Sequence, residues 1–174
     1  LELTDLVEII ATCRKQDING IIISMLHAYQ SPAHEDAVKN EIEHLAPDLF
    51  AFTSSEIWPV VREYERTTTT ILNGYVHPRV TGYLTGLEDT LSDLGMPAPP
   101  LLTKSNGGLM RAETGKRNCV SMLLSGTAAG VTGACWLARQ AGNDRVLTLD
   151  IGGTSADMAL IIDGQPQFGK DEKI

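Results

Sequence analysis

The segment from Leu147 to Gly164 constrains the fold most, because two apolar, strand-like runs flank a turn that carries an acidic residue, two glycines and a hydroxyl group. This arrangement predicts a β-hairpin. Gly152 and Gly153 in the turn are expected to take positive φ, so that consecutive backbone N–H groups can point at phosphate oxygens. A phosphate-binding hairpin is one interpretation, and a glycine-rich β-turn without a ligand is the other.

The polar residues of this hairpin suit a triphosphate ligand. Asp150, at the end of the first run, can hold Mg²⁺ or its water shell, and Thr154 adds a hydroxyl donor. Asp157 lies two or three residues into the second run, where it could support the loop or orient a water molecule. We therefore predict catalytic roles for Asp150 and Asp157, metal binding by Asp150, and phosphate contacts from Gly152, Gly153 and Thr154.

The composition excludes several classes of protein. With 43% hydrophobic and 21% charged residues, the chain resembles an ordinary folded domain. A net charge of −8 provides no basic surface for nucleic acid, and no apolar stretch is long enough to cross a bilayer. We expect a cytoplasmic protein that binds neither nucleic acid nor membrane. Cys13, Cys119 and Cys135 lack C-x-x-C spacing, so they indicate neither a disulfide framework nor a zinc site, and Cys135 is expected to be a buried thiol.

The first third of the chain predicts an α/β architecture. Apolar residues recur with helical spacing over residues 3–10, and an all-apolar strand follows at 21–25. Pro32 opens a helix that runs to about residue 45, and a second strand is expected at 49–53. Because the first strand is apolar on both faces, we expect a parallel sheet covered by helices.

Residues 59–94 are predicted to be mostly helical, with Pro78 bending or breaking the helix. Threonines are poor formers of a surface helix, so the run Thr67–Thr70 hints at a packed or ligand-facing segment. The charged residues near the start of the helix are expected to form solvated ion pairs: Arg62, Glu63, Glu65 and Arg66. His27 and His34, beside Glu35, lack a defined metal-ligand spacing, so we expect structural or surface histidines.

Two further segments offer donors for a ligand. A strand at 101–104 ends at a turn that could contact the substrate or could be an ordinary strand-ending turn; its residues are Ser105, Asn106, Gly107 and Gly108. Helices are expected at 115–123 and 127–140. Ser125 and Gly126 precede the second of these helices and could place its N-terminal N–H groups against a phosphate. Alternatively, Ser125 caps the helix and the small residues permit close packing.

Together with the hairpin, four segments resemble the hydantoinase A and 5-oxoprolinase family, in the family's order along the chain. They are Ser24–Tyr29 with His34 and Glu35, Ser55–Ile57 leading to Glu63–Thr70, Ser105–Leu109, and Leu124–Gly130. Thr127 stands where the family usually has proline. Since proline there is a helix-start preference and not a reacting group, the difference does not weaken the resemblance.

The resemblance implies an α/β protein that is part of an actin/hexokinase/Hsp70-like (ribonuclease H-like) ATPase fold, with a mixed sheet and helices on both faces. Residues 1–143 would end the first lobe and include a helical insertion. Residues 144–174 would begin the second lobe with its phosphate hairpin. The earlier phosphate loop of the family and its adenine-contacting part are not found in the sequence, so we expect an internal fragment that hydrolyses ATP poorly alone.

The implied activity is that of an ATP-dependent hydrolase that opens cyclic amides, such as hydantoins or 5-oxoproline-like lactams, with ATP and Mg²⁺ as cofactors. The alternatives are a subunit of an ATP-dependent ketone carboxylase of the same family and a non-catalytic ATP-binding or regulatory subunit. A small-molecule kinase of the same fold is disfavoured by the matches at Glu63–Thr70 and Ser105–Gly108. A second, hydantoinase B-like subunit is an expected partner.

Overall fold

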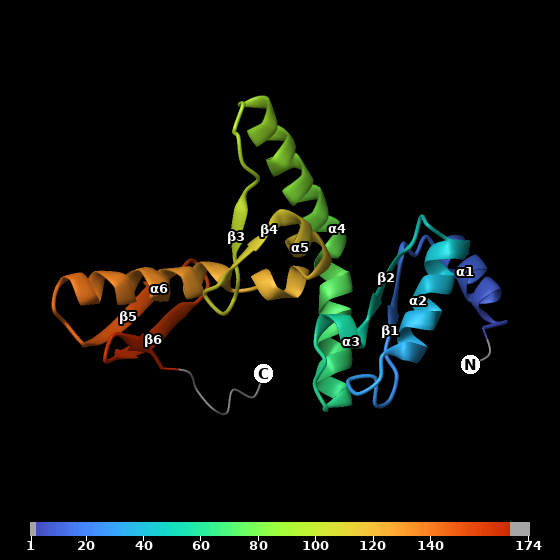
Figure 1. The fold of residues 1–174 in the computed structure, drawn as a ribbon, viewed down its shortest axis with the longest axis horizontal. Coiled ribbons are helices and arrows are strands. Elements are labelled where there is room, and N and C mark those ends of the chain that lie inside the picture. Colours follow the sequence, from blue (N-terminus) through green and yellow to red (C-terminus); the bar gives the residue numbers. More distant parts are fainter. Residues whose placement is uncertain (1–2, 168–174) are drawn as a thin grey trace. The chain divides into compact units, whose positions relative to one another are not determined.

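A computed structural model describes residues 3–167 of the chain, which form two compact units (Figure 1). Unit 1 comprises the described residues up to Gly86 together with Lys116–Val120, and unit 2 comprises Leu87–Gly115 and the described residues from Ser121 onward. The predicted lobe boundary near residue 143 concerns the complete protein and stays a prediction. Helices and strands alternate in the structure, which confirms a mixed α/β protein.

Unit 1 is built around two parallel strands. β1 (Gly20–Ile23) pairs with β2 (Phe50–Thr53), with Gly20 opposite Phe50 and Ile23 opposite Thr53. Helices α1 (Leu6–Lys15) and α2 (Ala33–Leu45) supply the residues that pack against this pair. The buried cluster contains Leu6, Ile23, Val38, Ile42 and Ala51. The predicted helix–strand order and the parallel pairing are confirmed.

The long helix α4 (Glu63–Asp93) follows the short helix α3 (Ser54–Ile57) and continues through Pro78, so of the bend or break predicted there the break is wrong and the bend stays a prediction. The ring of His77, immediately before the proline, packs against Phe50 and Phe52 with centroid distances of 4.5 and 5.0 Å. These contacts hold the helix at the position where the missing proline N–H weakens it.

The buried face of α4 is polar or small over most of its length. Its buried residues are Arg66, Thr70, Asn73, Gly74 and Leu84. Gly74 lies against Ile22, where an added Cβ would come within 2.6 Å of the isoleucine side chain. Asn73 donates to Arg117 O and accepts from Val120 N–H, each at 3.0 Å. In contrast, Tyr75 and Tyr83 are 80% and 69% exposed, so the apolar spacing identified the helix and not its packed face.

The described part of unit 2 contains two antiparallel sheets and one long helix. β3 (Leu101–Thr103) pairs with β4 (Leu109–Arg111), while β5 (Arg145–Ile151), β6 (Ala156–Ile162) and β7 (Gln165–Pro166) form a second sheet in that order. Helix α6 (Ser125–Gln140) packs against the second sheet.

Between β4 and α6 lie α5 (Ala112–Arg117) and the 3₁₀ turn η1 (Cys119–Met122), which replace the single helix predicted at 115–123. Cys13, Cys119 and Cys135 are buried thiols, as expected for Cys135. Among residues 3–167, no helix is long and apolar enough to span a membrane.

Candidate functional site

The predicted hairpin is present, and its two acidic residues lie directly across from each other. In the antiparallel pair of β5 and β6, Asp150 is opposite Asp157 and Ile151 is opposite Ala156. Directly opposite residues project to the same face of a sheet, with Cβ atoms about 5 Å apart. The hairpin therefore places two carboxyl groups side by side at the base of the glycine turn.

The turn itself differs from the expected phosphate nest. Neither Gly152 nor Gly153 has a positive φ, and the Gly152 N–H donates to Ser155 O at 2.9 Å. That hydrogen bond joins the first and last residues of the turn Gly152–Ser155, which the chain forms without a left-handed glycine. Gly153 and Thr154 are exposed, and the space beside Gly153 is open, so the turn remains accessible to a ligand.

Asp157 contacts the start of α6. Its Oδ2 accepts from Thr127 Oγ1 and from Ser155 Oγ, both at a long 3.4 Å. Asp157 is half-buried, whereas Asp150 is exposed. Of the two roles predicted for Asp157, these contacts suit support of the loop, because they connect the turn, β6 and α6.

An open hollow of about 490 Å³ lies beside these residues within unit 2. It brings together Ser105, Asn106 and Gly107 of the β3–β4 loop with Thr127 of α6 and Asp157 of β6. Three segments that are far apart in the sequence therefore meet at one hollow, which has the size of a small-molecule site. Some of the predicted site residues do not line it: Gly108, Ser125, Gly126, Asp150, Gly152, Gly153 and Thr154.

The β3–β4 loop uses most of its donors internally. Ser105 donates from both its N–H and its hydroxyl to Ser121 O at 2.7 Å, and Gly107 N–H donates to Lys104 O at 2.9 Å. Gly108 N–H donates to Asn106 Oδ1 at 3.0 Å, and Gly107 has a φ of 79°. This is a strand-ending turn that also lines the hollow. Among the described contacts of the loop, the Asn106 side-chain amide nitrogen remains for a ligand.

Helix α6 begins two residues earlier than predicted, and its cap is not a serine. Leu124 is the N-cap with a φ of 60° and no side-chain cap, while Ser125 is already the first helical residue. The expectation that Ser125 caps the helix is therefore wrong. The first-turn N–H groups of an α-helix have no partner within the helix, and the space around Gly126 is open. Anion binding at Ser125 and Gly126 stays a prediction.

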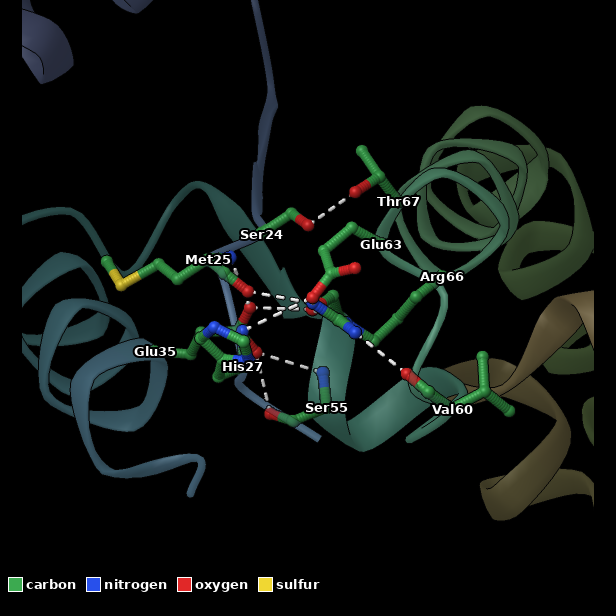
Figure 2. Close-up of polar contacts among 10 residues, drawn as sticks. Ser24, Met25, His27, Glu35, Ser55, Val60, Glu63, Arg66 and Thr67 are labelled. Atoms are coloured by element: carbon green, nitrogen blue, oxygen red, sulfur yellow. Dashed lines mark hydrogen bonds and ion pairs between the residues drawn. The ribbon is translucent and has the colours of Figure 1, made fainter. Parts of the chain in front are cut away.

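Unit 1 holds a buried polar network that the sequence did not reveal (Figure 2). The carboxylate of Glu35 is fully buried and accepts four hydrogen bonds. Its donors are Met25 N–H at 2.8 Å, Ser54 Oγ at 2.6 Å, Ser55 N–H at 2.9 Å and Ser55 Oγ at 2.7 Å. Burial alone would raise the pKa of Glu35, but these hydrogen bonds together lower it below its ordinary value.

Arg66 completes this network from α4. Its Nε donates to Ser54 Oγ at 2.9 Å, its Nη1 to Val60 O at 2.7 Å and its Nη2 to Met25 O at 2.8 Å. The side chain is fully buried and lies 5.9 Å from the centre of the Tyr29 ring. The expectation of a solvated ion pair is therefore wrong for Arg66, since a buried guanidinium must satisfy its donors within the protein.

Other residues near this network behave as expected. Arg62 and Glu65 form an exposed ion pair at 3.0 Å. Thr70 is buried and the other three threonines are half-buried, so the run is packed in part, while Thr67 shares an exposed hydrogen bond with Ser24 and a ligand-facing role stays a prediction. Within residues 3–167, no three histidine, cysteine or acidic side chains gather in a way that could hold a metal ion by themselves.

Comparison with known proteins places the chain in a family. A family model described as hydantoinase/oxoprolinase matches residues 66–174. The chain is 32% identical over 158 residues to caprolactamase subunit alpha of Pseudomonas jessenii, which covers 91% of the chain and 23% of that protein. It is 32% identical over 159 residues to the acetone carboxylase beta subunit of Xanthobacter autotrophicus, which covers 89% of the chain and 22% of that protein.

A solved structure agrees with these matches. A nucleotide-free acetone carboxylase, described in connection with ATP-dependent acetone carboxylation, aligns with a TM-score of 0.75 and 32% identity over 87% of the chain and 22% of that protein. The chain spans less than a quarter of the length of each of these three proteins. Since the family model covers well over half of the chain, this protein belongs to the hydantoinase/oxoprolinase family.

Proposed function

We propose that the chain is part of an enzyme that uses ATP to open a cyclic amide, and that its hairpin forms part of the nucleotide site. The observation that carries this proposal is the pairing of Asp150 with Asp157 at the base of an exposed Gly152–Ser155 turn, in a member of this family. The similarity to a caprolactamase subunit, whose name specifies a lactam, supports a cyclic amide as the substrate class.

The residues present fit Mg²⁺ bound together with phosphate. Mg²⁺ is usually held by one or two carboxylates, substrate phosphates and water, in contrast to an all-protein cage. Asp150 is exposed and adjacent to the turn, so it would hold the ion, while Asp157 lies opposite within reach of its water shell. The lack of a larger acidic or histidine cluster among the described residues agrees with such a sparse site.

The remaining residues would position the reactants. An amide carbonyl is a poor electrophile, and ATP with Mg²⁺ supplies the phosphoryl group that activates its oxygen. Gly153 and Thr154 would donate to phosphate oxygens from the exposed turn, and the first turn of α6 at Ser125 and Gly126 would place further N–H groups near negative charge. Asn106 would donate its side-chain amide to a ligand in the hollow.

Ketone carboxylation is the second candidate. The alignment with acetone carboxylase over 87% of the chain favours it, because the same phosphoryl activation can be applied to a ketone and bicarbonate. Several relatives are named as subunits, so a partner chain, such as a hydantoinase B-like subunit, is part of either proposal.

The test is phosphate release from Mg-ATP by the full-length protein, with its partner subunit where one exists. The substrates would be 5-oxoproline, hydantoins and simple ketones with bicarbonate, and Asp150→Asn would serve as the site variant. Release that depends on a lactam and on Asp150 supports cyclic amide opening. Release that depends only on a ketone with bicarbonate would favour the carboxylase, and no Asp150-dependent release would favour a binding or regulatory role.

A further inference from the structure

The Glu35–Arg66 network holds one short segment, the residues that follow β1 (Figure 2). Met25 is fixed from both sides, since its N–H donates to Glu35 and its carbonyl accepts from Arg66. Both charged side chains are fully buried. Removing two charged side chains from water costs free energy that their interactions only partly offset. Two buried charges that both bind one loop therefore fix the position of that loop more than they stabilise the fold.

The fixed loop presents polar groups at the carboxyl ends of the two parallel strands. Ser24 Oγ and Thr67 Oγ1 lie 2.5 Å apart, and His27 N–H lies 3.5 Å from a carboxylate oxygen of Glu63. The carboxyl ends of parallel strands are the usual place for ligands in α/β proteins. His27 is exposed and has a φ of 58°, a conformation that a histidine adopts only at a cost and that is more frequent at functional sites.

The charges around this loop favour a neutral ligand. All three donor groups of Arg66 are used within the protein, and Arg62 is paired with Glu65. Hydrogen bonding by its own backbone N–H lowers the pKa of Glu63, burial opposes this, and the His27 N–H and the Arg66 charge lower it further. Glu63 is half-buried and lies 3.9 Å from Arg66 Nη2, but its carboxylate stays ionised and partly accessible, so it would repel a bound anion.

We propose that Ser24, His27, Glu63 and Thr67 bind the amide group of a neutral ring. Glu63 would accept from the ring N–H, and the His27 imidazole would donate to the carbonyl oxygen together with whichever of the two hydroxyl groups does not donate to the other. This assignment rests on the proposed function and specifies its substrate class further. Neutral cyclic amides are preferred over 5-oxoproline, because its additional carboxylate would lie near the Glu63 carboxylate.

The experiment uses the full-length protein, with its partner subunit where one exists, and two matched ring amides. The compound 2-pyrrolidinone has the ring of 5-oxoproline without the carboxylate. Glu63→Gln removes the ionised acceptor, and Glu65→Gln is the control from the same helix. His27→Gly removes the imidazole while leaving a residue that tolerates positive φ. Phosphate release gives KM for each amide and for ATP, and calorimetry gives the Kd of 2-pyrrolidinone without ATP.

We expect Glu63→Gln to raise the KM and Kd of 2-pyrrolidinone roughly ten-fold or more, as for loss of a charged hydrogen bond, with KM for ATP unchanged. We expect His27→Gly to weaken binding as well, Glu65→Gln to have no effect, and Glu63→Gln to reduce discrimination against 5-oxoproline.

If lactams stimulate release but Glu63→Gln and His27→Gly bind them like Glu65→Gln, the site is refuted and the proposed function stands. If no lactam stimulates phosphate release but Glu63→Gln weakens 2-pyrrolidinone binding while Glu65→Gln does not, the binding site stands and the proposed function is refuted. If lactams neither stimulate release nor bind more weakly to Glu63→Gln, both the site and the proposed function are overturned.

Discussion

Replacing Glu35 by glutamine tests the buried network most directly, because the substitution keeps the shape and removes the charge. Four donors converge on the two carboxylate oxygens at 2.6 to 2.9 Å, two of them backbone N–H groups from Met25 and Ser55. Glutamine offers one acceptor oxygen and one NH₂ group, so one of those backbone donors must face another donor. The Ser54 hydroxyl cannot rotate freely to compensate, because it already accepts from Arg66.

The expected cost is about 3 kcal/mol, at the upper end of the range for hydrogen bonds to a charged group. Two terms contribute and they are not additive. Loss of hydrogen bonds to a charged acceptor is one, and loss of one of the two carboxylates near the buried Arg66 guanidinium, which keeps Glu63 at 3.9 Å, is the other. Since each 1.4 kcal/mol is a factor of ten, local opening should become about 100-fold more frequent.

Hydrogen exchange of the full-length protein, followed by mass spectrometry, measures this opening. Peptides that contain Met25 and Ser55 should exchange about 100-fold faster in Glu35→Gln, as the local opening constant rises. The exposed Glu65→Gln variant is the control and should differ from the parent by less than about 0.5 kcal/mol, because exposed ion pairs contribute little. Equal exchange in the two variants would refute the role assigned to Glu35.

The same network gives a pH dependence with a definite sign. The pKa of Glu35 is lowered in the folded protein, so the carboxylate contributes stability at any pH above its ordinary value of 4.5. That contribution is lost as the pH falls from there through the lowered value. The difference in Tm between the parent and Glu35→Gln should therefore shrink in acid, and a constant difference down to pH 3 would contradict the assignment.

Three other substitutions or treatments have definite outcomes. Gly20→Ala should destabilise unit 1 by about 1 to 3 kcal/mol, seen as a lower Tm, because the added Cβ would collide with the Phe50 ring. Burial raises the pKa of the Cys119 thiol to about 11, so iodoacetamide at pH 8 should label it only after unfolding, as peptide mass spectra would show. Asp150→Asn should protect the β5–β6 amides from exchange in the absence of Mg²⁺, because it removes like charge opposite Asp157.

The sequence predicted most of the secondary structure because local patterns control it. The hairpin, the parallel strand pair and the helix after Pro32 follow from apolar runs, turn residues and helix-start preferences, and each is present. The turn conformation could not be predicted in the same way. Gly152 permits positive φ without requiring it, and the hydrogen bond to Ser155 O selects another conformation.

Long-range contacts account for the features that the sequence did not predict. The burial of Arg66 depends on the Met25 carbonyl, which lies 41 residues away in the sequence and which no local pattern brings near α4. Pro78 remains within a helix because tertiary packing of His77 outweighs its local preference. Only its place in a family motif could have singled out Glu35 from the sequence. Its four hydrogen-bond donors come from segments 10 to 20 residues away, so no local pattern indicated its burial.

The facing carboxylates of the hairpin are the strongest physical argument for a cation. Like charges directly opposite each other destabilise a strand pair. The Asp157 carboxylate is partly compensated, because it accepts hydrogen bonds from Thr127 and Ser155. Asp150 is exposed and can share its charge with a metal ion bound at the turn. A divalent ion bound there would turn the repulsion into an attraction, because its charge would balance the two carboxylates. A hairpin shaped only by turn preferences would have no need of the opposed acidic pair, whereas a metal-dependent phosphate site uses it.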